Sequence, residues 1–114
     1  MNQPSSHDHE RQALRQQFPV LYDAVMELLY RYDPMKIKEP FILAGLQDKF
    51  EVPLEEYEPE TQTILPRLKE ANSALALRKI IYEEFVRWFH PLLMEGDEES
   101  FTELAEEMWG LIKG

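Results

Sequence analysis

The sequence predicts an all-α protein, a single small bundle of four to six helices with no significant sheet. Apolar residues recur with helical spacing in two long segments, 20–32 and 74–90, and nothing alternates with a period of two over a useful length. A chain of 114 residues with 44% hydrophobic residues has the size of one domain and enough apolar side chain for its core. We therefore treat residues 1–114 as one helical domain.

The first two helices are delimited by prolines. Residues 1–10 are expected to form a flexible polar tail, although Ser5 or Ser6 could also cap a short first helix that continues through 9–17. Pro19 disfavours helical conformation at Phe18 and suits the first turn of the second helix, 20–32. The next proline, in Asp33-Pro34, ends that second helix.

Residues 33–58 are expected to form an ordered, proline-rich connection. The segment is too apolar for a solvated linker, and a structureless loop of this length is unusual in a small domain. A short helix is predicted from Pro40, with Ile42, Leu46 and Phe50 one turn apart. Tyr57 is expected to pack back near the turn at Asp33.

Three more helices follow. One begins near Pro59, with Glu56, Glu58 and Glu60 at the positive end of its dipole, and Pro66 is expected to kink or split it. Asn72-Ser73 stops that segment and caps the central helix, 74 to about 90, where His90 is placed at the C-terminus. The apolar stripe of this central helix consists of Leu77, Ile80, Ile81, Phe85, Trp88 and Phe89.

The last helix is predicted from Ser100-Phe-Thr-Glu103, which has the sequence of a capping box. In that motif the serine hydroxyl accepts from one free N–H at the start of the helix, and the glutamate accepts from another. The residues expected to be buried by this helix are Phe101, Leu104, Ala105, Met108, Leu111 and Ile112.

Part of the chain resembles a known family. Tyr-Asp-Pro at 32–34, Ile37 and Glu-Tyr-Glu at 56–58 are followed by two apolar helices, and this order resembles the domain-of-unknown-function 1871 family of small helical bacterial proteins. The resemblance covers roughly 30–89. It implies an all-helical domain in which the Asp33-Pro34 turn and the Tyr57 segment are structural partners. The residues that match the two apolar helices are Ile64, Leu65, Leu68, Leu77, Ile80, Ile81 and Phe85.

The charge of the chain limits its partners. The net charge is −10, which argues against direct nucleic-acid binding because gripping phosphates requires clustered Lys and Arg. Five acids and no base fall between 51 and 60, and seven acids and no base between 95 and 107. These two clusters either attract a basic partner or are simply solvated helix ends and loops.

Several features favour a cytoplasmic protein, and the family resemblance implies a bacterial one. Cysteine is absent, the N-terminus lacks the pattern of a signal peptide, and no apolar run has the length of a membrane span. No membrane association is expected.

Candidate chemistry is sparse. His7-Asp8-His9 could supply two metal ligands, and Glu56 with Glu60, or Glu103 with Glu107, are i, i+4 pairs that could hold a divalent cation. Solvated side chains are the simpler interpretation of each, since no Glu-x-x-His motif accompanies them. The sequence also has no phosphate-binding loop and no nucleophile motif. We predict no cofactor, no metal and no catalytic residue.

Three functional hypotheses follow. The first is a non-catalytic protein–protein interaction module that binds a basic partner or a second copy of itself as a homodimer. The second is an antitoxin-like or immunity-like inhibitor that acts by acidic mimicry, and the third is a small metal-dependent enzyme. The first is preferred, and its candidate interaction residues are Asp33, Glu56, Tyr57, Glu60 and Trp109.

Overall fold

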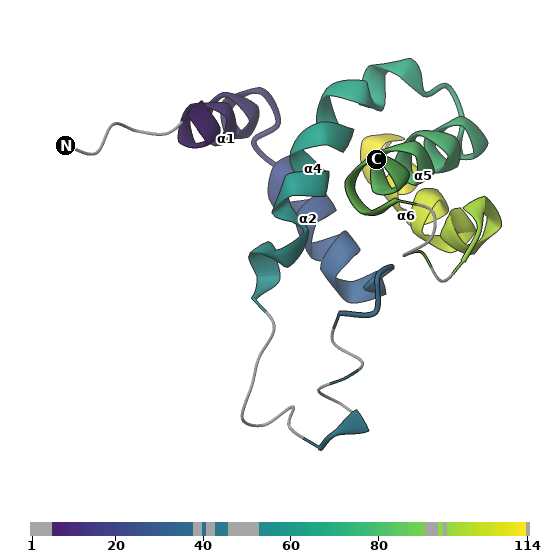
Figure 1. The fold of residues 1–114 in the computed structure, drawn as a ribbon. Coiled ribbons are helices and arrows are strands. Elements are labelled where there is room, and N and C mark those ends of the chain that lie inside the picture. The colour runs from purple at the N-terminus through teal and green to yellow at the C-terminus, as the bar shows by residue number, and fades with distance from the viewer. Residues whose placement is uncertain are drawn as a thin grey trace.

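The computed structural model describes residues 6–37, 40, 43–45, 53–90, 94 and 96–113, and within them it contains helices and no strand. The prediction of an all-α fold is confirmed (Figure 1). The α-helices are α1 (Ser6–Gln17), α2 (Leu21–Tyr32), α4 (Glu58–Ile64), α5 (Ala74–Phe89) and α6 (Thr102–Lys113). One-turn and two-turn 3₁₀ helices precede or follow them: η1 (Leu54–Tyr57), η2 (Leu65–Glu70) and η4 (Glu98–Phe101).

Four helices enclose the core. α5 packs on α6, α6 on α2, α2 on α4 and α4 on α5, so the four form a closed ring of contacts. α1 lies outside this ring, beside α4, at one side of the molecule (Figure 1). As a result, the α2–α6 side and the α4–α5 side are opposite edges of the bundle.

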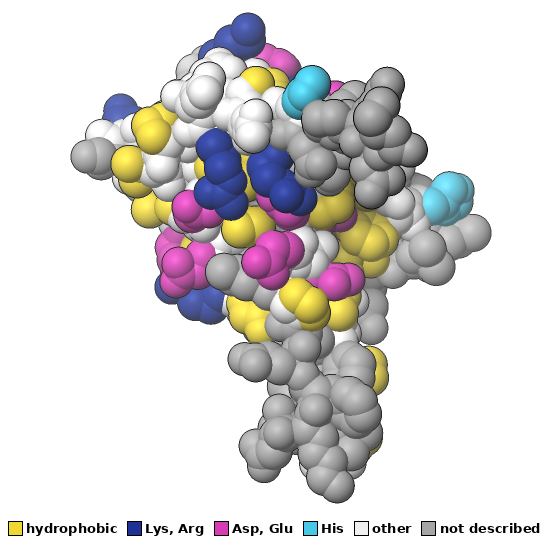
Figure 2. Space-filling view, turned by 90° about the vertical axis from the view of Figure 1, so that its left-hand side faces the viewer, with side chains coloured by type: hydrophobic (Ala, Val, Ile, Leu, Met, Phe, Trp, Pro, Cys, Tyr) yellow, Lys and Arg dark blue, Asp and Glu magenta, His cyan; other side chains and the backbone are white. Residues whose placement is uncertain are grey.

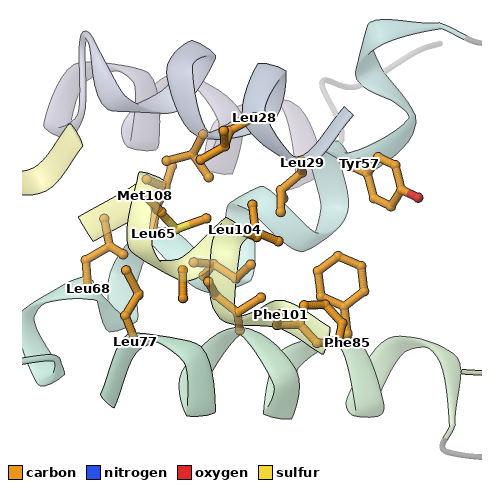
Figure 3. Packing of buried hydrophobic residues seen from close by; sticks show 14 of the residues in the cluster. Leu28, Leu29, Tyr57, Leu65, Leu68, Leu77, Phe85, Phe101, Leu104 and Met108 are labelled. Carbon is orange, nitrogen blue, oxygen red and sulfur yellow. The ribbon is translucent and has the colours of Figure 1, made fainter. Parts of the chain in front are cut away.

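The core is made of side chains that all four helices point into one centre (Figure 3). Phe85 of α5 lies in the middle of an aromatic group, with ring centroids 5.4 Å from Phe101, 5.8 Å from Phe89 and 6.0 Å from Tyr57. Offset and tilted aromatic pairs at these separations add to the stabilisation that burial alone provides. This group joins η1, α5 and η4, which are far apart in the sequence.

Several helix boundaries are as predicted. α2 ends at Tyr32, and Asp33 follows it in the left-handed conformation with φ 48°. Ser73 caps α5, because its hydroxyl oxygen accepts from the backbone N–H of Ala76 at 3.1 Å. Pro66 splits its segment, since α4 ends at Ile64 and the chain continues as the 3₁₀ helix η2. α5 ends at Phe89, with His90 in the C-cap position.

Other expectations were wrong. Ser100 does not cap α6: it lies inside η4, and its hydroxyl donates to the carbonyl of Asp97 at 2.6 Å. The extra 3₁₀ turn satisfies this serine locally and moves the start of α6 to Thr102. Trp88 and Leu111 were expected in the core, yet they are 48% and 42% exposed because each lies at the edge of its helix's apolar stripe.

α1 begins earlier than the sequence suggested. It starts at Ser6, so residues 6–10, assigned above to the tail, are helical. Of the short helix expected from Pro40, only Pro40 and 43–45 are described, and there the backbone N–H of Ala44 donates to the carbonyl of Pro40 at 3.1 Å; Ile42, Leu46 and Phe50 lie outside the described residues. Within the described part of the chain, every helix is too short or too polar to cross a membrane.

Candidate functional site

Asp33 and Tyr57 form a buried hydrogen-bonded pair. The Tyr57 hydroxyl donates to Oδ1 of Asp33 at 2.6 Å and accepts from the backbone N–H of Met35 at 3.0 Å. Oδ1 of Asp33 also accepts from the backbone N–H of Ile37 at 2.9 Å. The two side chains are 7% and 1% exposed, so these predicted interaction residues hold the turn after α2 against η1.

Glu60 is a buried carboxylic acid in the first turn of α4. It is 3% exposed, and its Oε1 has no hydrogen-bond partner among the described residues. Burial raises the pKa of Glu60 to about 7, and the nearby charge of Glu56, which is exposed, adds to the shift. Glu60 is therefore largely protonated in the folded protein below neutral pH.

Glu58 anchors the outlying helix α1. Its carboxylate accepts from Nη2 of Arg11 at 3.0 Å and from the Tyr22 hydroxyl at 2.5 Å. Nε2 of Gln62 donates to the same hydroxyl at 3.1 Å. Burial and the bond to Glu58 raise the pKa of Tyr22. α1, α2 and α4 are thus joined by one polar network.

The face that carries α1 shows basic and acidic side chains lying directly beside one another (Figure 2). Arg15 of α1 pairs with Asp23 of α2 at 2.9 Å, and its guanidinium lies 4.4 Å from the centre of the Tyr22 ring. Both arginines of α1 are thus paired with acids of other helices.

Glu84 is a further buried acid, with 0% exposure. Its Oε2 accepts from Nη1 of Arg67 at 2.9 Å, and Arg67 also bonds Glu70 and Glu83. Glu83 and Glu84 are adjacent in the sequence, yet only Glu84 is buried. The spacing in the sequence indicates this burial, because Glu84 lies seven residues, or two helical turns, after the buried Leu77 and so on the same face of α5.

α6 displays a row of exposed acids. Glu103, Glu106 and Glu107 lie on one face of this helix at i, i+3 and i+4, and all three are exposed. Glu107 pairs with Arg31 of α2 and accepts from the Tyr32 hydroxyl at 2.8 Å. Within the described residues, neither Glu103 nor Glu106 makes an ion pair.

Glu107 lines a groove between α2 and α6, whereas Glu106 lines a separate groove, between α5 and α6, together with Leu75 and Arg78. The α2–α6 groove has a volume of about 260 Å³ and is lined by apolar residues, including Leu28 and the exposed Leu111, and by Glu27, Arg31 and Glu107. Trp109 belongs to the same helix and is half-buried, with the ammonium of Lys113 5.7 Å from its ring centre. This arrangement places aliphatic surface and acid side by side.

The five predicted interaction residues therefore fall into two groups. Asp33, Glu56, Tyr57 and Glu60 belong to one region around η1, where only Glu56 is exposed. Trp109 lies on α6 with the unpaired acids. The described residues contain no group of three or more His, Asp or Glu side chains arranged to hold a metal ion.

No protein-family model, no curated protein and no solved structure matches this chain.

Proposed function

We propose that this protein is a non-catalytic interaction module that binds a basic protein partner on the exposed face of α6 and in the α2–α6 groove next to it. The observation that carries the proposal is the pair Glu103 and Glu106, exposed on one face of α6 and free of ion pairs among the described residues. Elsewhere, the exposed arginines Arg15 and Arg31 each have an acidic partner. An unneutralised acidic row beside an aliphatic groove is complementary to a helix with lysines on one side and leucines on the other.

The geometry favours an amphipathic partner over a purely charged one. Leu111 is 42% exposed at the mouth of the α2–α6 groove, so an aliphatic side chain that covers it buries apolar surface. The surrounding carboxylates then steer and orient the partner, while the apolar contact contributes most of the affinity. Salt should consequently weaken binding without abolishing it.

The test is a binding titration with a fluorescent helical peptide built from leucine and lysine. Reversing two charges with E103K and E106K together should weaken binding by about tenfold, since each exposed charge contact is worth up to about 1 kcal/mol. The matched control is E55K with E56K, which changes the net charge equally at exposed positions on η1. Equal weakening by the two double variants would show that only net charge matters and would refute a site on α6.

A second variant tests the apolar part of the site. Leu111→Ser removes the exposed aliphatic side chain, and we expect it to weaken peptide binding while leaving the salt dependence unchanged. Unchanged affinity in this variant would contradict the groove as the docking position. Light scattering of the free protein distinguishes a foreign partner from a second copy of this chain.

A further inference from the structure

A second candidate groove lies on the opposite edge of the bundle. It has a volume of about 500 Å³ and is enclosed by α1, by α4 with η2, and by α5. Its apolar walls include Leu14 and Pro66, and its polar lining includes Glu10, Arg67, Glu84 and Arg87. The groove thus combines a hydrophobic channel with a charged end.

The charged end contains an unsatisfied acceptor. Glu84 is 0% exposed, and its Oε1 has no hydrogen-bond partner among the described residues. The nearest cation that faces this oxygen is Nη1 of Arg87, at 3.7 Å, which is too far for a hydrogen bond. A buried carboxylate oxygen without a hydrogen-bond donor is energetically unfavourable. A ligand donor that reaches this oxygen therefore contributes more binding free energy than it would at an exposed acid.

Neither neighbouring arginine serves as that donor. Arg67 already uses Nε, Nη1 and Nη2 in bonds to Glu70, Glu83 and Glu84, and it holds the other oxygen of Glu84 in place. The side chain of Arg87 is 72% exposed, so it is free to swing outward. When it does, the carboxylates of Glu70, Glu83 and Glu84 share the single guanidinium of Arg67, and the charge of this group is −2.

We propose that this groove binds a lysine side chain of a partner protein, with the ammonium donating to Oε1 of Glu84 and displacing Arg87. Lysine fits better than arginine, because only one oxygen of Glu84 is free, whereas a guanidinium prefers two acceptors. The aliphatic stem of the lysine packs along Leu14 and Pro66.

Trp88 marks the margin of this lysine site. Its indole N–H donates at 3.2 Å to the hydroxyl of Thr63, which lines the groove, and the side chain is 48% exposed. An exposed indole beside a cation site offers a further attractive surface and a spectroscopic reporter.

The inference rests on the proposed function only in that the lysine belongs to a partner protein.

The test is an NMR titration of the full chain, labelled with ¹⁵N, against Nα-acetyl-lysine N-methylamide. We expect saturable shifts of the Gln62 and Thr63 backbone amides and of the Trp88 indole N–H. The analogue acetylated at Nζ, which lacks the charge, should produce none of them. Identical shifts with the two compounds would overturn the proposal.

Three variants sharpen this test. Glu84→Gln should weaken binding by about tenfold, because it removes the charge of the acceptor. Arg87→Ala changes a side chain that is 72% exposed, and it should tighten binding several-fold because the competing cation is gone. Unchanged or weaker binding in R87A would refute the proposal even if E84Q failed to fold.

The third variant separates this site from the α2–α6 surface. Lysine binding should be unaffected by E103K with E106K, which test the proposed function on the far edge of the bundle. If the double variant lost lysine binding and E84Q retained it, the groove would be refuted as the lysine site, while the proposed function would be unaffected.

Discussion

Replacing Glu60 with glutamine should change how the stability of the domain depends on pH. Glu60 is 3% exposed, and burial raises its pKa from 4.5 to about 7. In the unfolded chain the same group titrates near its ordinary value. Between these two pKa values the folded protein binds more protons than the unfolded one, so the free energy of unfolding falls as pH rises.

The size of this effect follows from the shift. A difference of about 2.5 pKa units at 1.36 kcal/mol per unit corresponds to about 3 kcal/mol, an order-of-magnitude figure. The contribution of Glu60 is fully present below about pH 4.5, and it is lost as pH rises through about 7. A glutamine side chain does not titrate. As pH rises from about 4.5 to about 7, the free energy of unfolding of E60Q should therefore increase by about 3 kcal/mol relative to that of the wild type.

Urea denaturation followed by tryptophan fluorescence measures the difference at several pH values. The two proteins are compared by how their free energies of unfolding change with pH. The buried glutamine amide of E60Q shifts the free energy of unfolding by the same amount at every pH, so this shift cancels. Glu56→Gln is the matched control: this neighbour is exposed, and its charge is only the minor cause of the raised pKa. Parallel pH profiles for E60Q and the wild type would show that Glu60 is ionised normally in the folded state and would refute the argument.

Three further changes test the fold. Tyr57→Phe removes the hydroxyl that bonds Asp33, and urea denaturation should show a decrease of about 2 kcal/mol in the free energy of unfolding. The control is Tyr82→Phe, which should cost much less because the Tyr82 hydroxyl makes no described hydrogen bond. Gly110→Ala adds a methyl group that meets nothing within 4 Å inside α6, so the melting temperature should rise, by the equivalent of up to about 1 kcal/mol. Glu58→Gln weakens the anchor of α1, and hydrogen exchange should accelerate in residues 9–17 more than in α5; uniform acceleration would contradict a local anchor.

The helices were predictable because their signals are local. The stripes of α2 and α5, the left-handed turn at Asp33 and the cap at Ser73 each depend on residues within one or two helical turns. The expected contact of Tyr57 with the Asp33 turn is also confirmed. In contrast, the start of α6 was missed because the Ser100 motif is equally compatible with a preceding 3₁₀ turn.

The buried acids were not predictable from local pattern. Glu58 and Glu60 were placed at a helix N-terminus, where acids are usually solvated, and yet the structure buries both. The reason is long-range: Glu58 is paired with Arg11, which lies 47 residues away in the sequence. A short window that contains Glu58 holds no hint of that arginine, so its burial follows only once α1 has been placed beside α4.

These buried acids also explain how a strongly acidic chain maintains a specific arrangement of helices. Glu58 links three helices through Arg11 and Tyr22, and Glu84 fixes η2 against α5 through Arg67. Each link is satisfied in only one register, because sliding either helix would leave a buried carboxylate without its donor. Glu60 and Oε1 of Glu84 depart from this rule. Burial raises the pKa of Glu60 to about 7, so this acid is largely uncharged below neutral pH, whereas Glu84 lines the groove from which we propose that a lysine donates to Oε1.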